Sequence, residues 1–330
     1  MRLASGTQAP RRRFNEAFAG AVLDGLSQPQ KTIPCAWLYD RRGSELFEEI
    51  TGLDEYYPTR TEIGLFDAHM PEMVHPVGPG AVVVEIGSGS SRKTPTLLRA
   101  LPEPHAYVPV DIAHEFVLES TGLLAQIFTS LHIRPLIADF TRPFELPAEL
   151  MSAQRPRLGF FPGSTIGNLC PWDAVAFLRR MAGTLGAGAH MLIGADCTRD
   201  ADILLPAYDD ARGITAAFNL NLLARINREL NGDFVLERFR HEARYRRRQG
   251  HTPGRIEMHL VSTCTQAAQV CGRRFRFSAG ESIHTENSYK YSPAEFRALA
   301  TAAGWLPAHC WSDQQQRFSV HLLRLPPYIN

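Results

Sequence analysis

The stretch Val82-Val83-Val84-Glu85-Ile86-Gly87-Ser88-Gly89 decides the fold. Its apolar, β-branched start lies between Gly80 and Gly87, as expected for a short strand that is buried on both faces of a parallel sheet. Glycines allow a backbone to pass close to a ligand because they carry no Cβ. A helix that begins after such a loop directs its first N–H groups toward bound anions. The stretch therefore predicts the first strand and first loop of a nucleotide-binding α/β sheet.

Strands and helices alternate along the chain from this stretch onward. Such alternation is typical of a parallel sheet with helices on both faces. The expected strands are 82–86, 106–111, 133–138, 158–161 and 189–195, the expected helices lie near 93–101, 113–130, 171–185 and 293–303, and a hairpin of strands 306–312 and 317–324 completes the sheet.

The alternation stops after Asp196. Residues 201–230 repeat apolar side chains at helical spacing, and residues 234–283 then read as short strands joined by turns. This block does not continue a Rossmann-like sheet. We expect an α/β protein with a second, α+β substrate-binding lobe (14–60 and 199–288), a Rossmann-like domain (61–198 and 289–330) and an unstructured start (1–13).

Composition excludes several classes of function. The chain has 330 residues, 21% of them charged, and a formal net charge of +1, which gives no electrostatic case for binding nucleic acid or an anionic membrane. The six cysteines form no C-x-x-C pair, so we expect neither a metal site nor a disulfide framework. No run approaches the roughly 20 apolar residues of a membrane span, and residues 1–13 lack the apolar segment of a secretory signal. We therefore expect a cytoplasmic protein, and a monomer, because no long exposed apolar stripe stands out.

Residues at the ends of the expected strands identify the cofactor. A dinucleotide loop has the pattern G-x-G-x-x-G, but Arg92 stands where the third glycine would be. Glu85 ends the first strand, as in the E-x-G-x-G of class I methyltransferases, and Asp111 ends the second strand, where it can bind a ribose. Asp139 and Phe140 end the third, where a carboxylate can accept the adenine amino hydrogens and an aromatic ring can pack on the base. The pattern favours S-adenosylmethionine, and with it the Rossmann-like sheet of the class I methyltransferases, in which the last strand runs antiparallel. An NAD-linked oxidoreductase and a non-catalytic cofactor-binding module are the alternatives from other classes.

Three further stretches gather polar groups in apolar surroundings. In an open α/β sheet, ligands bind beyond the carboxyl ends of the strands. Asn168 follows the fourth expected strand, so we expect it to face the transferred methyl group, with the nearby glycines leaving room for a substrate. The stretches are Leu53 to Arg60, Phe161 to Leu169, and His284 to Tyr291. We expect Leu53 to Arg60 to be a loop between a helix at 44–50, with Ser44 as its N-cap, and a helix that begins at Thr61.

Together these residues resemble the histidine-specific methyltransferases, which trimethylate the α-amine of L-histidine to hercynine in ergothioneine biosynthesis. The resemblance covers roughly residues 31–325. Related members of this superfamily methylate other aromatic amino acids, so a tryptophan derivative is the alternative substrate. The resemblance is carried by Tyr39 to Phe47, Glu55 to Glu62, Glu85 to Lys93, Gly163 to Leu169 and Thr285 to Tyr291.

The resemblance implies a role for each of a set of residues. Lys93 would pair with the methionine carboxylate of the cofactor, because a cation at a helix start opposes the helix dipole and needs an anionic partner. No residue is implied as a dedicated general base. The implied cofactor-binding residues are Tyr39, Gly87, Lys93, Asp111, Asp139 and Phe140. The implied L-histidine-binding residues are Tyr56, Asn168 and Tyr208 for the carboxylate and amine, Gly163 with Asn168 to orient the amine, Glu286 and Ser288 for the imidazole, and Met258 and Phe47 around the ring.

Overall fold

The computed structural model describes residues 8–151 and 155–327. They group into two compact units, each described by itself below. The sheet unit comprises 51–151, 155–204, 247–255 and 288–327, and the accessory unit comprises 8–50, 205–246 and 256–287. Of the stretch expected to be unstructured, residues 1–7 lie outside the described residues, and helix α1 (Gln8–Leu26) begins within the remainder.

The sheet unit contains eight strands within the described residues, in the order β12-β13-β6-β5-β1-β2-β3, with β4 also paired to β2. The pairs made by β1, β2, β5 and β6 among themselves are parallel, whereas β13 runs antiparallel to both β6 and β12. This order, with one antiparallel strand near an edge, is the class I methyltransferase sheet that the sequence predicts. The strands are β1 (Val82–Ile86), β2 (Ala106–Asp111), β3 (His132–Ile133), β4 (Leu136–Ile137), β5 (Arg157–Phe161), β6 (His190–Asp196), β12 (Leu306–Ser312) and β13 (Phe318–Arg324).

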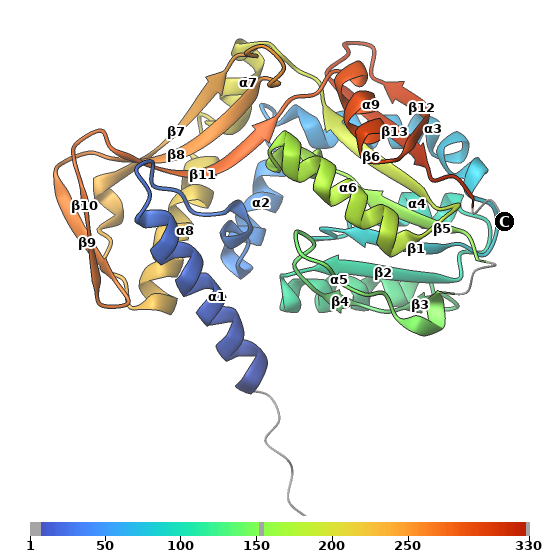
Figure 1. The fold of residues 1–330 in the computed structure, drawn as a ribbon, viewed down its shortest axis with the longest axis horizontal. Coiled ribbons are helices and arrows are strands. Elements are labelled where there is room, and N and C mark those ends of the chain that lie inside the picture. The colour runs from blue at the N-terminus through green and yellow to red at the C-terminus, as the bar shows by residue number, and fades with distance from the viewer. Residues whose placement is uncertain (1–7, 152–154, 328–330) are drawn as a thin grey trace, which may run out of the picture. The chain divides into compact units, whose positions relative to one another are not determined.

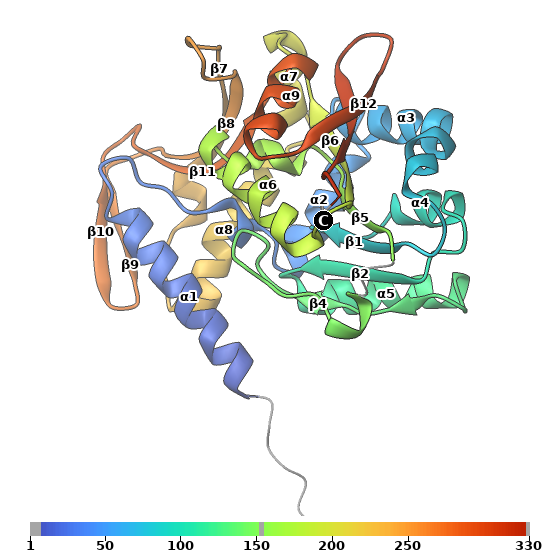
Figure 2. The same ribbon diagram turned by 45° about the vertical axis from the view of Figure 1, so that its right-hand side comes forward.

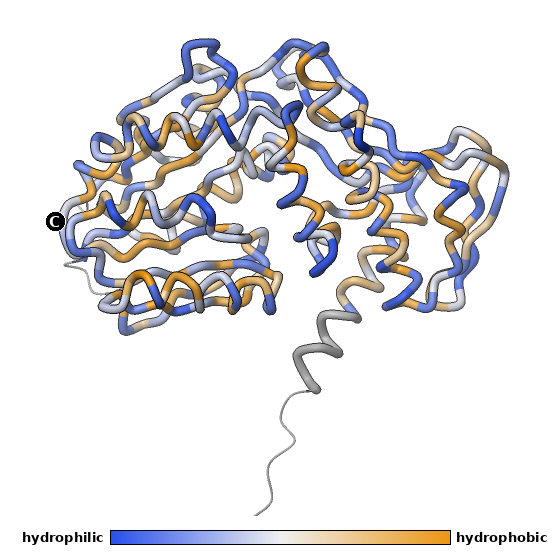
Figure 3. Tube along the Cα trace, turned by 180° about the vertical axis from the view of Figure 1, so that it is seen from behind, coloured by the Kyte–Doolittle hydropathy of each residue, from blue (hydrophilic) through white to orange (hydrophobic). Residues whose placement is uncertain are grey.

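Helices cover both faces of this sheet (Figures 1 and 2). Buried side chains of α3 (Tyr57–Val74), α4 (Thr94–Ala100) and α5 (His114–Ile127) pack on one face, and those of α6 (Pro171–Leu185) and α9 (Pro293–Ala302) on the other. Strand β1 shows why: Val82 and Val84 join the α6 side of the core, while Val83 joins the α3 side. All five residues of β1 are buried, and the sheet strands are largely orange in the hydropathy view of Figure 3.

Two expectations for the sheet unit are corrected. The expected strand 133–138 is interrupted as β3 and β4, which flank Arg134 and Pro135, because a proline has no N–H to donate to a neighbouring strand. Helix α3 begins at Tyr57 rather than at Thr61, so half of the expected loop 53–60 is helical. Pro58 lies in the first turn of α3, where its missing N–H has no intrahelical partner to lose.

The accessory unit combines helices with antiparallel strands. A three-stranded sheet has the order β11-β8-β7, and β9 pairs antiparallel with β10. Helix α8 contacts β7, and its Arg225 guanidinium lies over the rings of Phe18 and Trp37, with carbon-to-centroid distances of 4.7 and 5.6 Å. The elements that lie wholly or partly in this unit are α2 (Arg41–Thr51), α7 (Ala201–Tyr208), α8 (Ile214–Leu230), β7 (Phe239–Arg246), β8 (Arg255–Ser262), β9 (Gln266–Val270), β10 (Arg273–Phe277) and β11 (Ser282–Tyr289). Across the two units, short 3-10 turns occur at Cys35–Leu38, His75–Val77, Ala148–Leu150, Thr165–Asn168 and Leu236–Arg238.

Capping carboxylates account for two differences from the expected helices here. Helix α2 begins at Arg41, and Ser44, expected as its N-cap, lies inside it; Asp40 instead accepts the Gly43 N–H at 2.8 Å. The expected helical stretch 201–230 is two helices, because Asp210 accepts the N–H groups of Ile214 and Thr215 at 3.0 and 2.7 Å and so caps a new helix. Among the described residues, no helix is long and apolar enough to cross a membrane.

Candidate active site

The loop after β1 is shaped for a ligand. Gly87 and Gly89 have φ values of +66° and +49°, which side chains rarely adopt, and a Cβ built on Gly87 would lie 3.6 Å from the Phe140 ring. Between them, the Ser88 hydroxyl is buried and has no hydrogen-bond partner among the described residues. A buried, unsatisfied hydroxyl is costly unless a bound molecule satisfies it. The loop therefore fits a bound nucleotide-type cofactor.

Asp111, at the end of β2, is fixed beside that loop. One carboxylate oxygen accepts the Gly89 N–H at 3.0 Å and the other accepts the Ala113 N–H at 3.0 Å. An ionised carboxylate has lone pairs to spare after two such bonds. Asp111 is thus held by the backbone in an orientation that leaves acceptor capacity for the hydroxyl groups of a ribose.

Glu85 has an internal role instead. It is 2% exposed and accepts hydrogen bonds from the Thr94 hydroxyl and the Tyr107 hydroxyl, both at 2.6 Å. Burial raises the pKa of Glu85 from 4.5 to about 7, against the lowering effect of the two hydroxyls. The acid of the E-x-G-x-G pattern therefore joins β1, α4 and β2, and so holds the glycine loop in place.

Asp139 and Phe140 follow β4, on the neighbouring strand end. Asp139 accepts the Thr141 N–H at 2.9 Å, and its other oxygen lies 3.5 Å from Arg142 Nε. The Phe140 ring packs edge-to-face on Phe161 and Phe177, at centroid distances of 5.6 and 5.9 Å. The aromatic ring is therefore rigidly held next to Gly87, while the carboxylate is partly exposed.

A buried carboxylate that sequence reasoning missed lies next to Lys93. Glu62 of α3 is fully buried, pairs with the Lys93 ammonium, and accepts the Gly163 N–H at 3.0 and 2.9 Å with its two oxygens. A Cβ on Gly194 of β6 would lie 2.0 Å from Glu62 Oε1, so this site requires glycine. The available signal was periodicity: Glu62 precedes Leu65 and Phe66 at helical spacing, which places it on the apolar face of its helix.

The loop after β5 carries Gly163 and Asn168. Ser164 has a φ of +58°, and its hydroxyl accepts the Asp196 N–H at 2.9 Å. Gly167 approaches a neighbouring strand so closely that a Cβ there would lie 2.7 Å from the carbonyl oxygen of Tyr289. Asn168 ends the 3-10 turn Thr165–Asn168 and is partly buried. The loop is therefore clamped on two sides.

Two more predicted substrate residues belong to the sheet unit. Tyr56 is 7% exposed and directly precedes α3. Ser288, near the end of β11, is 3% exposed and accepts a hydrogen bond from the Lys290 ammonium at 2.9 Å. The sheet unit thus holds the cofactor candidates at the carboxyl ends of its strands. Only Tyr39 of that predicted set lies elsewhere.

The accessory unit contains Tyr39 in an aromatic cluster. Its ring makes edge-to-face contacts with Phe47 and Phe218 at centroid distances of 5.5 and 5.4 Å. Tyr208, at the end of α7, is 7% exposed, and its carbonyl oxygen lies 2.7 Å from Nε2 of the buried His241. Tyr39 and Phe47, predicted for different ligands, therefore share one cluster.

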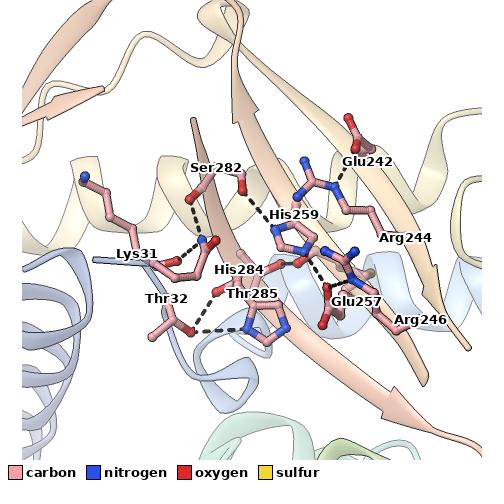
Figure 4. A network of polar contacts seen from close by, with 12 residues as sticks. Lys31, Thr32, Glu242, Arg244, Arg246, Glu257, His259, Ser282, His284 and Thr285 are labelled. Carbon is pink, nitrogen blue, oxygen red and sulfur yellow. Dashed lines mark hydrogen bonds and ion pairs between the residues drawn. The ribbon is translucent and has the colours of Figure 1, made fainter. Parts of the chain in front are cut away.

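Met258 and Glu286 lie on the adjacent strands β8 and β11, and both are buried, at 2% and 8% exposure. Figure 4 shows the polar network that ties these strands together: His259 lies between Ser282 and Glu257, at 3.1 and 3.2 Å. Arg246 of β7 donates to Glu257 at 2.8 Å. The strands that carry the two residues are therefore tied together by side chains. Among the described residues, no group of three or more His, Cys, Asp or Glu side chains could hold a metal ion.

Comparison with known proteins gives consistent matches. The family model described as "Histidine-specific methyltransferase, SAM-dependent" matches residues 18–325. A histidine N-alpha-methyltransferase of Mycolicibacterium smegmatis is 37% identical over 312 residues, 93% of this chain and 94% of that protein. One of Mycobacterium tuberculosis is 38% identical over 306 residues, 91% and 92% of the two chains. A possible exported protein from Bordetella parapertussis shares the fold, with a TM-score of 0.50, 10% identity, and coverage of 97% and 100%.

Proposed function

The chain belongs to the histidine-specific, S-adenosylmethionine-dependent methyltransferases, and we propose that it converts L-histidine to hercynine by three successive methylations of the α-amine, a step of ergothioneine biosynthesis. The observation that carries this proposal is the family match over residues 18–325, which spans both units. The glycine loop, its orphaned Ser88 hydroxyl and the fixed Asp111 carboxylate support the cofactor.

In this proposal the sheet unit holds most of the cofactor. S-adenosylmethionine supplies an electrophilic methyl group on a sulfonium centre when bound. Asp111 accepts the ribose hydroxyls, Asp139 accepts the adenine amino group, and Phe140 packs on the base beside Gly87. Lys93 pairs with Glu62 and, because an ammonium has three hydrogens to donate, also binds the carboxylate of the methionine part; Tyr39 completes the set. These roles agree with the exposure of Asp139 and with the backbone bonds that fix Asp111.

The substrate is held by a second set of residues. Tyr56 and Tyr208 bind the carboxylate of L-histidine, and Asn168 orients its amine together with the Gly163 carbonyl. Glu286 and Ser288 bind the imidazole, and Met258 and Phe47 surround the ring. Orientation is the main contribution expected of the protein. Methyl transfer is an in-line displacement, so the amine nitrogen, the methyl carbon and the sulfonium sulfur must lie in a line.

The protonation state of the substrate amine sets a requirement on the site. The nucleophile is the neutral amine, yet an α-amine with a pKa near 8 is mostly protonated at pH 7. Asn168 and a backbone carbonyl can accept the N–H hydrogens of the neutral amine and so hold its lone pair toward the methyl group. We assign no dedicated general base; the proton leaves to solvent or through a tyrosine.

Glu286 supplies the preference for histidine over other aromatic amino acids. Its buried carboxylate accepts an imidazole N–H, whereas a phenyl ring offers no such donor. A methyltransferase for a tryptophan derivative is the alternative, and it predicts that Glu286 is dispensable.

Mass spectrometry of L-histidine incubated with the enzyme and S-adenosylmethionine tests the proposal. We expect a product with the mass of three added methyl groups, preceded by intermediates with one and two. Incubation with each of the other common amino acids is the control, and the absence of any mass change on histidine would overturn the proposal. Calorimetry with S-adenosylmethionine, S-adenosylhomocysteine and NAD separates methyl transfer from nicotinamide chemistry.

We also propose that the enzyme is a cytoplasmic monomer. All six cysteines are free thiols, as is typical of proteins kept in a reducing compartment. Light scattering of the purified protein tests the monomer, and a mass twice that of the 36.8 kDa chain would exclude it.

A further inference from the structure

A buried ion pair at the carboxyl end of β6 takes no part in the roles described above. Asp196, the last residue of β6, and Lys290, which follows β11, lie 2.7 Å apart (Oδ2 to Nζ), and both side chains are 0% exposed. Tyr57 donates its hydroxyl hydrogen to the same Oδ2 at 2.6 Å, and Thr198 donates its N–H to Oδ1 at 2.9 Å. A fully buried pair is tolerated when additional hydrogen bonds satisfy both charges. This cluster meets that condition and lies entirely within the sheet unit.

Three arms extend from Asp196, through its contacts with Tyr57, Ser164 and Lys290. Each arm ends at a residue predicted to bind the substrate, or next to one. Tyr57 directly follows Tyr56. The Asp196 N–H donates to the hydroxyl of Ser164 at 2.9 Å, one residue after Gly163 in the loop that also carries Asn168. Lys290 donates to Ser288 itself at 2.9 Å. The start of α3, the loop after β5 and the end of β11 therefore meet at one aspartate.

We propose that Asp196 is a positioning residue for the methyl-accepting amino acid, and that it acts through Tyr57, Ser164 and Lys290. The inference rests on the proposed function, because the substrate roles of Tyr56, Gly163 and Ser288 are part of that proposal. The three hydrogen bonds lead to the start of α3, the loop after β5 and the end of β11, so we expect the cluster to act mainly on the substrate.

Lys290 adds a specific consequence for recognition of the imidazole. A hydroxyl has one hydrogen to donate and two lone pairs. Since Ser288 accepts from the Lys290 ammonium, its own hydrogen points away from that cation. Ser288 then donates to the unprotonated nitrogen of a neutral imidazole. Neither a phenyl nor an indole ring offers such an acceptor, so Lys290 sets the specificity of Ser288 for the neutral imidazole ring.

The chain offers a matched pair of substitutions as a test. Tyr57 and Tyr107 are both buried tyrosines that donate at 2.6 Å to a buried carboxylate at a strand end of the same unit, Asp196 and Glu85 respectively. Tyr57→Phe should raise the KM for histidine about tenfold by displacing the neighbouring Tyr56, less than the roughly hundredfold cost of a 1 Å misplacement at the reacting atoms, with the Kd for S-adenosylmethionine within twofold of wild type. Tyr107→Phe should instead raise the Kd for S-adenosylmethionine and leave the KM for histidine close to that of wild type. Equal effects of both variants on both ligands would show a merely structural role and overturn the inference.

Lys290→Met tests the specificity arm. It should lower the ratio of kcat/KM for histidine to that for tryptophan, while S-adenosylmethionine still binds. An unchanged ratio in a variant that binds the cofactor overturns the role of Lys290; if this variant does not fold, the Tyr57→Phe comparison decides alone.

Wild-type activity separates failure of this inference from failure of the proposed function. If wild type methylates another amino acid, the KM comparison is made with that substrate. If it methylates none, hydrogen exchange of residues 53–58 and 163–168 decides: faster exchange in Tyr57→Phe than in Tyr107→Phe supports positioning by Asp196, and equal exchange overturns it.

Discussion

Substitution of Glu62 by glutamine tests whether the two ligand-binding loops of the sheet unit are coupled. Glu62 is 0% exposed and Lys93 is 13% exposed, so the charge pair is nearly dry. Both carboxylate oxygens also accept the Gly163 N–H, at 3.0 and 2.9 Å. Glutamine has the same shape but no charge, and its NH₂ group would face either the ammonium or the Gly163 N–H, each of which is a donor. One of these contacts must therefore open.

The expected cost can be worked from these contacts. Breaking a buried ion pair by removing one partner costs about 3–5 kcal/mol, and we expect the lower end because the Lys93 side chain is 13% exposed. A hydrogen bond to a charged group contributes about 1.5–3 kcal/mol. If that bond limits local opening, the Gly163 amide should exchange about 10–100 times faster in Glu62→Gln.

Hydrogen exchange of the peptide 160–168 is the assay, because it reports on this loop even if the two units unfold separately. Glu72→Gln is the matched control: Glu72 lies on the same helix, but its side chain is 66% exposed, so we expect a change within about 0.5 kcal/mol. In a double-mutant cycle with Lys93→Met, the coupling energy should exceed about 1 kcal/mol. Unchanged Gly163 exchange, together with additive single substitutions, would refute the coupling.

Three further predictions follow from single contacts. Gly194→Ala should lower stability by about 1–3 kcal/mol, because its Cβ would lie 2.0 Å from Glu62 Oε1; a thermal unfolding temperature equal to that of wild type would contradict this. Burial raises the pKa of Glu85 from 4.5 to about 7, so the folded state holds this proton more tightly than the unfolded state. Its stabilising contribution is therefore present below pH 4.5 and lost as the pH rises to about 7. Glu85→Gln, which mimics the protonated form, should gain about 3 kcal/mol relative to wild type across that range, and a difference independent of pH would rule this out. Glu286→Ala should raise the KM for histidine at least tenfold, by loss of a hydrogen bond to a charged group, whereas unchanged kinetics would favour the tryptophan alternative.

Much of the sheet unit was predictable because its signals are local. Strand β1 and the helices near it follow from runs of a few residues, and the positions of Glu85, Asp111 and Asp139 are marked by strand ends. The errors are local as well. The sequence predicts a loop at Pro58, which lies in the first turn of a helix, and a cap at Ser44, whereas Asp40 accepts the capping N–H.

The sequence by itself determined the class I sheet, the family and the residues proposed to touch each ligand, because hydrophobic periodicity and strand-end chemistry extend over only a few positions. Only the tertiary structure decided which buried charges support those residues. Glu62 meets Lys93 across 31 positions and Gly163 across 101. Asp196 meets Lys290 across 94 positions and Tyr57 across 139. A carboxylate on an apolar helix face or at a strand end gives no indication of its partner until folding removes it from water, and the requirement that a buried charge be paired then selects that partner.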